Sequence, residues 1–363
     1  MRKLSAFACA VTVAATLSAA AVTGAAAAVA GAIVIGPGQS IQNAIDHASP
    51  GSTILLKPGV YHQSVMIRTD RITLRGAGDF AGGTVLEPPA SMPHTICNIA
   101  FGPTGVCVFA KKLNPKTHAV IKTVNNDTVT DLSVIGFPAN GVFGYGTNGM
   151  KVTNVAAINN GGYGISRFAS TATLFADDLA MGSHEAGFYI GDSPDADTLV
   201  RDNRATGNQF GIFVRHAREV RVISNRVTQN CQGILVLDDG QQGGAGTTLI
   251  ARNTVYRNNK FCPKHGDTPV NLQGGGILLL GATKTTVEGN SVGGNVGKLF
   301  NSGGIVVLSA HSITHGSNPN LDKVRNNTAY HDHPADLVWD GSGLGVRFTA
   351  NRCRTSAPSG LCH

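Results

Sequence analysis

The 363-residue sequence lacks several patterns that identify common functional classes. It has no CxxC pair or Cys/His spacing typical of a zinc site, so a structural metal site is not expected. It has no Lys/Arg-rich run with interleaved aromatic residues, which argues against nucleic-acid binding. It also has no cluster of Met, His and Cys of the kind that binds copper. A function based on nucleic acid, structural zinc or copper delivery is therefore disfavoured.

Two regular architectures are also missing. No 12-residue window of the repetitive region carries the i, i+3, i+4, i+7 apolar stripe of an amphipathic helix, which excludes helical repeats. The regularly spaced leucines of leucine-rich repeats are absent as well. No linker of different composition divides the chain, so we expect a single domain after the N-terminal segment.

Residues 1–30 have the features of a secretory signal peptide. Arg2 and Lys3 precede an Ala-rich apolar run without acidic residues, and small residues near Ala30 offer cleavage sites. Cys9 lies too early in this run to be a lipoprotein cysteine. The alternative is that the run is retained as an anchor. We expect cleavage near Gly31, secretion, no membrane association of the mature chain, and a monomer.

The composition of the mature chain is consistent with an extracellular protein. Removing the two cations of the signal lowers the formal net charge from +7 to +5, which fits an acidic polysaccharide partner but also a protein without one. Six cysteines remain, and an even count in an exported chain indicates disulfides. Neighbour pairing is the simplest of the roughly 15 possible connectivities. It would join Cys97 to Cys107, Cys231 to Cys262, and Cys353 to Cys362.

A hexapeptide framed by asparagine or a similar polar residue recurs along the chain. A short β-branched segment precedes each copy, and a glycine that opens another apolar segment follows it, as in GIFV and GILV. The copies are NVAAIN (154–159), DLAMGS (178–183), NRATGN (203–208), NRVTQN (225–230), NTVYRN (253–258), NSVGGN (290–295) and NTAYHD (327–332). Weaker copies begin at Asp131 and Asn351.

A period of about 22 to 25 residues built from short strands and Gly/Asn turns is typical of a solenoid. The fold class we predict is all-β, a right-handed parallel β-helix with three strands per coil and about ten coils. Equivalent residues of stacked coils form ladders. An inward asparagine can bond the backbone of its own turn and the amide of the next coil, so we interpret the asparagines as structural.

The domain organisation follows from this pattern. Ser40 is a candidate helix N-cap with Ile41, Ala44, Ile45 and Ala48 on one helical face, which predicts a short helix that caps the first coil. We assign 31–363 to one β-helix domain. It divides into an N-terminal cap with the first coils (31–86), an irregular loop (87–120) that is either a long loop or an irregular coil, and the repeat coils (121–363).

The cap sequence SIQNAID…PGSTILLKPGVY…ITLRGAG, followed by repeated GI-x-V…N-x-[VA]-x-x-N coils, resembles the pectate-lyase-like superfamily of right-handed parallel β-helix proteins. Within it, AGFYIGDS, NQFGIFV and CQGILVLD resemble secreted bacterial β-helix repeat proteins related in pattern to NosD-like proteins and mannuronan epimerases. The resemblance implies enzymes that cut or epimerise acidic polysaccharides, with sites on the outer face of one strand per coil.

The signature motifs of known members are absent. Asp238-Asp239 and KHG (264–266) imitate the polygalacturonase-like aspartates and GHG only loosely, because the NTD and RIK elements are missing. The DPHD tetrad of alginate epimerases is missing too, and HDHP (331–334) is only superficially similar to it. The resemblance therefore specifies the fold more strongly than the activity.

Strand alternation predicts which side chains face outward. In GFYIGD, Phe188 and Ile190 should face the interior and Tyr189 the outside, and the next coil should place Phe213 and Arg215 outside in the same way. The set that we expect on one outer face comprises Arg167, His184, Glu185, Tyr189, Asp192, Phe213, Arg215, His216, Asp238 and Asp239.

The lengths of the insertions predict a groove over the same face. The surplus residues fall in segments 238–246, 260–273 and 309–320, which all follow or precede the same strand of their coils and would wall one side. A Cys231–Cys262 bridge would fix the second wall, which also carries His265. Outward Phe213, Leu235, Leu278, Leu280 and Leu308 would form a groove floor or a partner surface.

Elimination on a uronate polymer needs a cation for the carboxylate, a base for the C5 proton and an acid for the leaving oxygen. The candidates for each role are divided as follows: Arg215 and Arg167 as the cation; His184, His216 and Tyr189 as base or acid; Phe213, Asp239 and His265 as substrate contacts; and Asp192, Asp195, Asp238 and Asp239 as Ca²⁺ ligands. Hydrolysis would instead need two carboxylates, such as Glu185 and Asp238.

Simpler interpretations compete with these roles. An outward His or Tyr on a solenoid is often only a surface residue, and the segment 193–197 also fits an ordinary acidic turn. The leading hypothesis is a secreted polysaccharide lyase or epimerase that acts on an acidic glycan, with calcium as a candidate cofactor. The alternative is a non-catalytic β-helix that binds a glycan or a partner.

Overall fold

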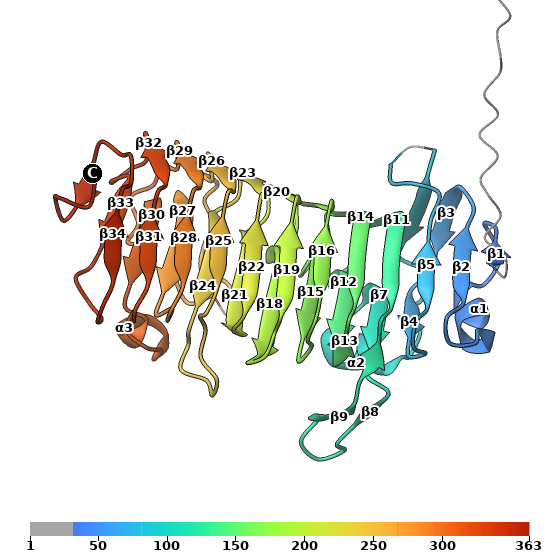
Figure 1. The fold of residues 1–363 in the computed structure, drawn as a ribbon. Helices are drawn as coiled ribbons and strands as arrows, with labels where there is room; N and C mark the ends of the chain where they lie inside the picture. Colours follow the sequence, from blue (N-terminus) through green and yellow to red (C-terminus); the bar gives the residue numbers. More distant parts are fainter. Residues whose placement is uncertain (1–31, 81, 267, 363) are drawn as a thin grey trace, which may run out of the picture. The chain divides into compact units, whose positions relative to one another are not determined.

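Three ladders of short parallel strands build the chain into a β-helix (Figure 1). The computed structural model describes residues 32–80, 82–266 and 268–362, so the proposed signal peptide lies outside the described residues. Residues Gly31–His363 form one compact unit. Within the described residues, no helix combines the length and hydrophobicity needed to cross a membrane.

One ladder is an 11-stranded parallel sheet with one strand per coil, in agreement with the predicted count of about ten coils. Its strands, in stacking order, are β4 (Val65–Ile67), β7 (Thr104–Phe109), β12 (Asn140–Tyr145), β15 (Ile165–Phe168), β18 (Ala186–Ser193), β21 (Phe210–Ala217), β24 (Gln232–Leu237), β27 (Gly275–Leu280), β30 (Gly303–Leu308), β33 (Leu337–Trp339) and β35 (Ser356–Ala357).

The other two ladders share a 20-stranded sheet, because the long strands β11 (Thr128–Ile135) and β14 (Lys151–Ile158) belong to both. The remaining strands of the first are β1 (Ile33–Ile35), β2 (Thr53–Leu56), β5 (Thr73–Arg75), β16 (Leu174–Ala176), β19 (Thr198–Arg201), β22 (Val220–Ile223), β25 (Leu249–Ala251), β28 (Thr286–Glu288), β31 (Lys323–Arg325) and β34 (Arg347–Thr349). Those of the second are β3 (Gly59–His62), β6 (Thr84–Glu87), β17 (Leu179–Met181), β20 (Arg204–Thr206), β23 (Arg226–Thr228), β26 (Thr254–Tyr256), β29 (Ser291–Gly293) and β32 (Thr328–Tyr330).

One set of asparagines lies at the bends between these two strand ladders, and a second set lies at the bends that lead into the 11-stranded sheet. The preceding residue adopts a left-handed backbone conformation, with φ of 56° at Asp202, 58° at Ser224 and 55° at Arg252. Asn203 donates from its backbone and side-chain nitrogens to Oδ1 of Asn225 at 3.0 Å, and the arrangement repeats in the following coils. The predicted structural role of the asparagines is confirmed. The side chains thus form two asparagine ladders. The first asparagine ladder contains Asn203, Asn225, Asn253, Asn290, Asn327 and Asn351; the second contains Asn208, Asn230, Asn258, Asn295 and Asp332.

The helix α1 (Ile41–His47) covers the first coil. The Ser40 side chain accepts a hydrogen bond from the backbone N–H of Asn43, as an N-cap does. Ile41, Ala44 and Ile45 are buried and join the interior cluster. The residues expected to form the capping helix therefore do so.

The segment 87–120, for which the sequence predicts a long loop or an irregular coil, has the form of an irregular coil. It contains the helix α2 (Ile96–Phe101), the strand β7 of the 11-stranded sheet, and an antiparallel hairpin of β8 (Lys112–Leu113) and β9 (Val120–Lys122). The coil continues here, and its irregular sequence reflects two insertions rather than a break. Two further short strands, β10 (Val124–Asn125) and β13 (Thr147–Asn148), pair beside it.

Candidate functional site

The outer face of the 11-stranded sheet carries an apolar row. Tyr189 pairs with Phe213, Phe213 with Leu235, and Leu235 with Leu278 in successive strands. Phe188 and Ile190, their neighbours in the chain, belong to the interior cluster instead. The predicted alternation is confirmed, but the outward side chains are buried rather than exposed. Other segments of the chain must therefore cover this face of the sheet.

The cover is formed by the predicted insertions. The segment 260–273 is joined to the start of β24 by the disulfide between Cys231 and Cys262, and the segment 309–320 contains the helix α3 (His311–Thr314). The other disulfides join Cys97 to Cys107 and Cys353 to Cys362, so all three neighbour pairings are as expected.

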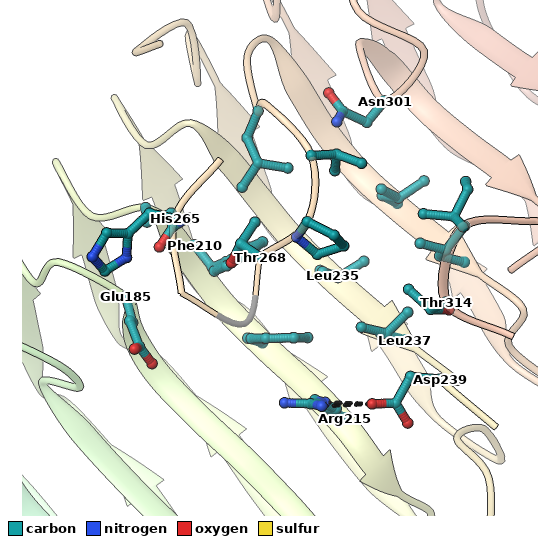
Figure 2. Close-up of a pocket in the computed structure, with 18 of the residues that line it drawn as sticks. Glu185, Phe210, Arg215, Leu235, Leu237, Asp239, His265, Thr268, Asn301 and Thr314 are labelled. Atoms are coloured by element: carbon teal, nitrogen blue, oxygen red, sulfur yellow. Dashed lines mark hydrogen bonds and ion pairs between the residues drawn. The ribbon is translucent and has the colours of Figure 1, made fainter. Parts of the chain in front are cut away.

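The insertions enclose a cavity of about 260 Å³ over the apolar row (Figure 2). Its floor comes from β21, β24 and β27, and its walls come from the segments 260–273, 300–301 and 313–314. The lining residues are Tyr163, Glu185, Gln209, Phe210, Phe213, Arg215, Leu235, Leu237, Asp239, His265, Thr268, Pro269, Val270, Leu272, Leu278, Leu280, Phe300, Asn301, Ile313 and Thr314. Most of this surface is hydrocarbon, so the few polar groups determine what it can bind.

We expect the Cys231–Cys262 disulfide to hold the wall of this cavity. Replacing both cysteines by serine should lower the free energy of unfolding by about 3–4 kcal/mol, because the bridge closes a loop with a sequence separation of 31. Denaturant unfolding measures this loss, and ligand binding should weaken with it. The matched control is the double serine variant of Cys353 and Cys362, remote from the cavity lining, which should leave ligand binding unchanged.

One end of the cavity is charged. Arg215 donates to Oδ2 of Asp239 from Nε at 2.8 Å and from Nη2 at 2.6 Å. Burial acts to lower the pKa of Arg215, but the bonds to Asp239 outweigh it and the pKa is raised overall. The buried His216 contacts Asp239 through its Nε2 atom, and its Nδ1 atom lies 3.1 Å from Oδ1 of Asp192. These partners hold the Arg215 guanidinium at the cavity edge.

A tyrosine and a glutamate form the polar side next to this pair. Tyr163 stacks on Tyr189 with ring centroids 4.5 Å apart. Burial raises the pKa of Tyr163, and the charges of Tyr189 and Glu185 and a hydrogen bond to Glu185 raise it further. The hydroxyl is therefore protonated at neutral pH and can act as a proton donor, while Glu185 offers an acceptor beside it.

The opposite end of the cavity holds an amide. Asn301 is buried and donates from Nδ2 to the carbonyl of Asn271 at 2.8 Å. That bond fixes the orientation of the amide, and Oδ1 is buried without a hydrogen-bond partner. Gln209, also buried, lies one residue before β21 and lines the cavity as well.

The structure brings together only part of the predicted site. Glu185, Phe213, Arg215, Asp239 and His265 line the cavity. His184 is exposed and lies outside the lining, and Tyr189 is buried beneath the cavity against Phe213. Asp238 faces away from the cavity, where its Oδ1 accepts from the backbone N–H of Gly240. His216 acts on the cavity only through Asp239.

The outward placement of Arg167 is wrong. Arg167 pairs with the inward Ile190, is fully buried, and donates to the carbonyls of Ser170 at 2.8 Å and Ala196 at 3.0 Å. The hydroxyls of Ser193 and Thr198 complete its shell, and burial lowers its pKa to about 9. A guanidinium so fully bonded inside the coil is structural and cannot contact a substrate.

The calcium ligands proposed from the sequence do not come together. Asp192 and Asp195 are exposed, and Asp192 is the partner of His216. In the part of the chain that the structure describes, no group of three or more His, Cys, Asp or Glu side chains is arranged to hold a metal ion.

Tyr163, Gln209 and Asn301 are site residues that sequence reasoning missed. Gln209 directly precedes a strand of the outer face, as does Glu185, so its position relative to the repeat offered a signal. Tyr163 lies in the turn GGYG before β15, and Asn301 in the turn before β30. Turns of that kind occur in every coil, and nothing in the sequence distinguishes these two.

Parallel coils with a walled cavity on the outer face of one sheet define a β-helix protein with a candidate ligand site on its solenoid. The chain belongs to the family described as "Right handed beta helix region", which matches residues 140–353. No curated protein matches the chain by sequence.

Solved structures resemble the chain in fold. The mannuronan C-5 epimerase AlgE4 A-module of Azotobacter vinelandii is 17% identical, with a TM-score of 0.59 over 86% of this chain and 90% of its own. The AlgE6 A-module of the same organism is 18% identical, with a TM-score of 0.54 over 87% and 92%. The periplasmic alginate epimerase AlgG is 13% identical, with a TM-score of 0.55 over 88% and 83%. At these identities the likeness establishes the fold alone.

Proposed function

We propose that the protein is a secreted, carbohydrate-active β-helix protein that binds an acidic glycan on the outer face of the 11-stranded sheet and acts on it as a lyase or epimerase. The observation that carries the proposal is the walled cavity with the Arg215 guanidinium at one end. Three disulfides agree with export. The named activity of the epimerases with the same fold is consistent with the substrate class.

The polar end of the cavity offers the groups that this chemistry requires. Arg215 neutralises the uronate carboxylate, which makes the C5 proton acidic, and Glu185 accepts that proton. In elimination the C4–O bond then breaks, a C4–C5 double bond forms, and the protonated Tyr163 donates its proton to the leaving oxygen. In epimerisation the proton returns to C5 from the opposite face and no bond of the chain breaks.

The test is incubation of the purified protein with a panel of uronate polymers. Ultraviolet absorbance of unsaturated ends detects elimination, reducing-end assays detect hydrolysis, and NMR of the polymer detects epimerisation. Product with at least one polymer is expected. A folded protein that yields none of the three products on the whole panel excludes the catalytic proposal.

A second candidate is a non-catalytic glycan-binding protein. The specific observation in its favour is that the charge of Arg215 is already compensated by Asp239, while His184 and Asp238 lie outside the cavity. Binding without product in the same panel, measured by calorimetry, would select this candidate.

Substitution of Arg215 by lysine tests the proposed site. Lysine keeps the charge but loses the paired N–H donors of the guanidinium, so we expect activity to fall about 100-fold, or binding by about tenfold if the protein is non-catalytic. The matched control is Arg221→Lys in β22, at an exposed arginine remote from the cavity. This variant should keep the activity and the binding affinity of the unmodified protein. Equal loss in both variants would contradict a role of Arg215 in the site.

A further inference from the structure

The outer faces of β20, β23, β26, β29 and β32 form a basic strip that the proposed function does not use (Figure 1). These strands pair in that order, and Thr328 of β32 pairs with Arg352 beyond it. None of the residues of the strip lines the cavity. The strip comprises residues 204–207, 226–229, 254–257, 291–294, 328–331 and 352–354, together with Lys260, whose Nζ donates to the carbonyl of Gly207 at 2.8 Å.

The charge of this basic strip has one sign. Its cations, all exposed, are Arg204, Arg226, Arg257, Lys260, Arg352 and Arg354. The segments of the strip contain no Asp or Glu, and at the bend before β20 the exposed Asp202 is already bonded to Arg201 at 2.7 Å. Residues 31–363 outside the strip have 21 Lys and Arg and 22 Asp and Glu, so the positive excess of the chain lies on the strip. This face therefore attracts an anionic partner.

The central row of the basic strip consists of side chains that donate hydrogen bonds. In stacking order the row contains Arg204, Arg226, Thr254, Ser291, Thr328 and Arg352. Guanidinium groups bind carboxylates, and serine and threonine hydroxyls both donate and accept hydrogen bonds. Because the arginines lie at the two ends and the hydroxyls between them, a matching chain carries negative charges spaced among hydroxyl groups.

The length of the row requires a polymer. Arg204 and Arg352 are five coil steps of about 4.8 Å apart, which is roughly 24 Å in total, so no single sugar or small anion spans the row. Two of the guanidinium groups are held by aromatic rings. That of Arg226 lies 4.7 Å from the ring centroid of Tyr256, and that of Arg354 lies 5.7 Å from the ring centroid of Tyr330. Such contacts lower the entropy that these side chains lose when a ligand binds.

We propose that the basic strip is a second glycan-binding surface, which holds a linear polysaccharide with carboxylate groups. The proposal stands without the proposed function, because the strip and the cavity share no residue. A polysaccharide has hydroxyl groups for Thr254 and Ser291, whereas a nucleic acid carries a phosphate at every step and few hydroxyls for the middle of the row. Attachment at the strip raises the effective concentration, at the cavity, of a polymer long enough to reach both.

The experiment is calorimetric titration of the full protein with polymannuronate at low ionic strength. The strip variant replaces Arg204, Arg226 and Arg257 by glutamine. We expect it to bind about tenfold more weakly, because three exposed ionic contacts are lost. The control variant loses the same charge on the neighbouring strand ladder and should keep the affinity of the unmodified protein. It replaces the exposed residues Arg221, Lys323 and Arg347 by glutamine.

Four results overturn the inference. They are equal weakening in both variants, which is an effect of net charge; unchanged affinity in the strip variant; no binding of polymannuronate by the unmodified protein; and equal or tighter binding of single-stranded DNA of the same charge. Repeating the titration with Arg215→Lys added to each protein removes turnover and most binding at the proposed site. Weaker binding of the strip variant in that series supports the strip, whether or not uronate polymers yield product.

Discussion

Asn253→Ala is expected to lower the free energy of unfolding by about 4 kcal/mol. Asn253 lies in the middle of the first asparagine ladder, where its Oδ1 accepts from the backbone and side-chain nitrogens of Asn225 at 2.8 and 3.0 Å. Its Nδ2 donates to the carbonyl of Val222 at 2.9 Å and to Asn290. Alanine removes the partner of the buried Asn225 backbone N–H and of the Val222 carbonyl, whereas Nδ2 of Asn225 keeps the carbonyls of Val200 and Ile223. Each group that loses its partner costs about 1–3 kcal/mol.

The measurement is chemical denaturation followed by circular dichroism, with Asn148→Ala as the matched control. The Asn148 side chain is exposed, and its loss should change the stability by less than about 0.5 kcal/mol. A loss below about 1 kcal/mol in Asn253→Ala would show that the ladder relaxes around the gap and that its bonds add little. The recurring asparagine would then need another explanation.

The same ladder explains why the fold was predictable from the sequence. Each coil must satisfy the backbone groups of its bend, and few side chains do this as Asn203 and Asn225 do, so the requirement repeats with the coil. The sequence predicts only a long loop or an irregular coil for the segment 87–120, because its coil has no such asparagine and carries two insertions. The periodic signal ends there, although β7 continues the sheet.

Arg167 shows where strand alternation is a better guide than charge. Ile165 faces inward, Ser166 outward, and alternation then places Arg167 inward, yet a guanidinium is usually assigned to solvent. The interior accepts it because hydroxyls and carbonyls at the strand end complete its hydrogen bonds. A sequence reveals the direction of such a side chain, but not the partners that make its burial tolerable.

The candidate site was only partly predictable for a related reason. Insertion lengths located the walls over the outer face, and alternation placed Phe213 and Arg215 beneath them. Neither indicates which side chain of an insertion reaches the cavity. His184 and Glu185 are consecutive, and only Glu185 lines it. Asn301 could not be found at all, because its orientation in the turn before β30 depends on the Asn271 carbonyl of the insertion 260–273.

The second asparagine ladder ends in an aspartate, Asp332, rather than in an asparagine. Asp332 Oδ1 accepts from the backbone and side-chain nitrogens of Asn295, both at 2.8 Å, but Oδ2 is buried without a partner. Burial is the main cause that raises the pKa of Asp332 from 3.8 to about 7; the nearby Asp336 adds to this effect, and the bonds from Asn295 oppose it. The position therefore holds a carboxylic acid at pH 5 and a costly buried carboxylate at pH 8.

Asp332→Asn should consequently stabilise the protein at high pH. Because the folded state binds the proton more tightly than the unfolded state, the contribution of Asp332 to stability is fully present below pH 4 and is lost as the pH rises to about 7. Asparagine keeps the acceptor for Asn295 and carries no charge. We expect a gain of about 4 kcal/mol at pH 8 and almost none at pH 4.

Denaturation of both proteins at the two pH values isolates this effect, because Asp127 and Asp322, whose pKa values burial also raises to about 7, remain in both. Substitution of the exposed Asp195 by asparagine is the control and should change stability by less than about 0.5 kcal/mol at either pH. A gain of equal size at pH 4 and pH 8 would mean that the amide contributes a new hydrogen bond rather than the removal of a buried charge. The end of the second ladder would then resemble its middle, where the donor and the acceptor of Asn258 are both in use.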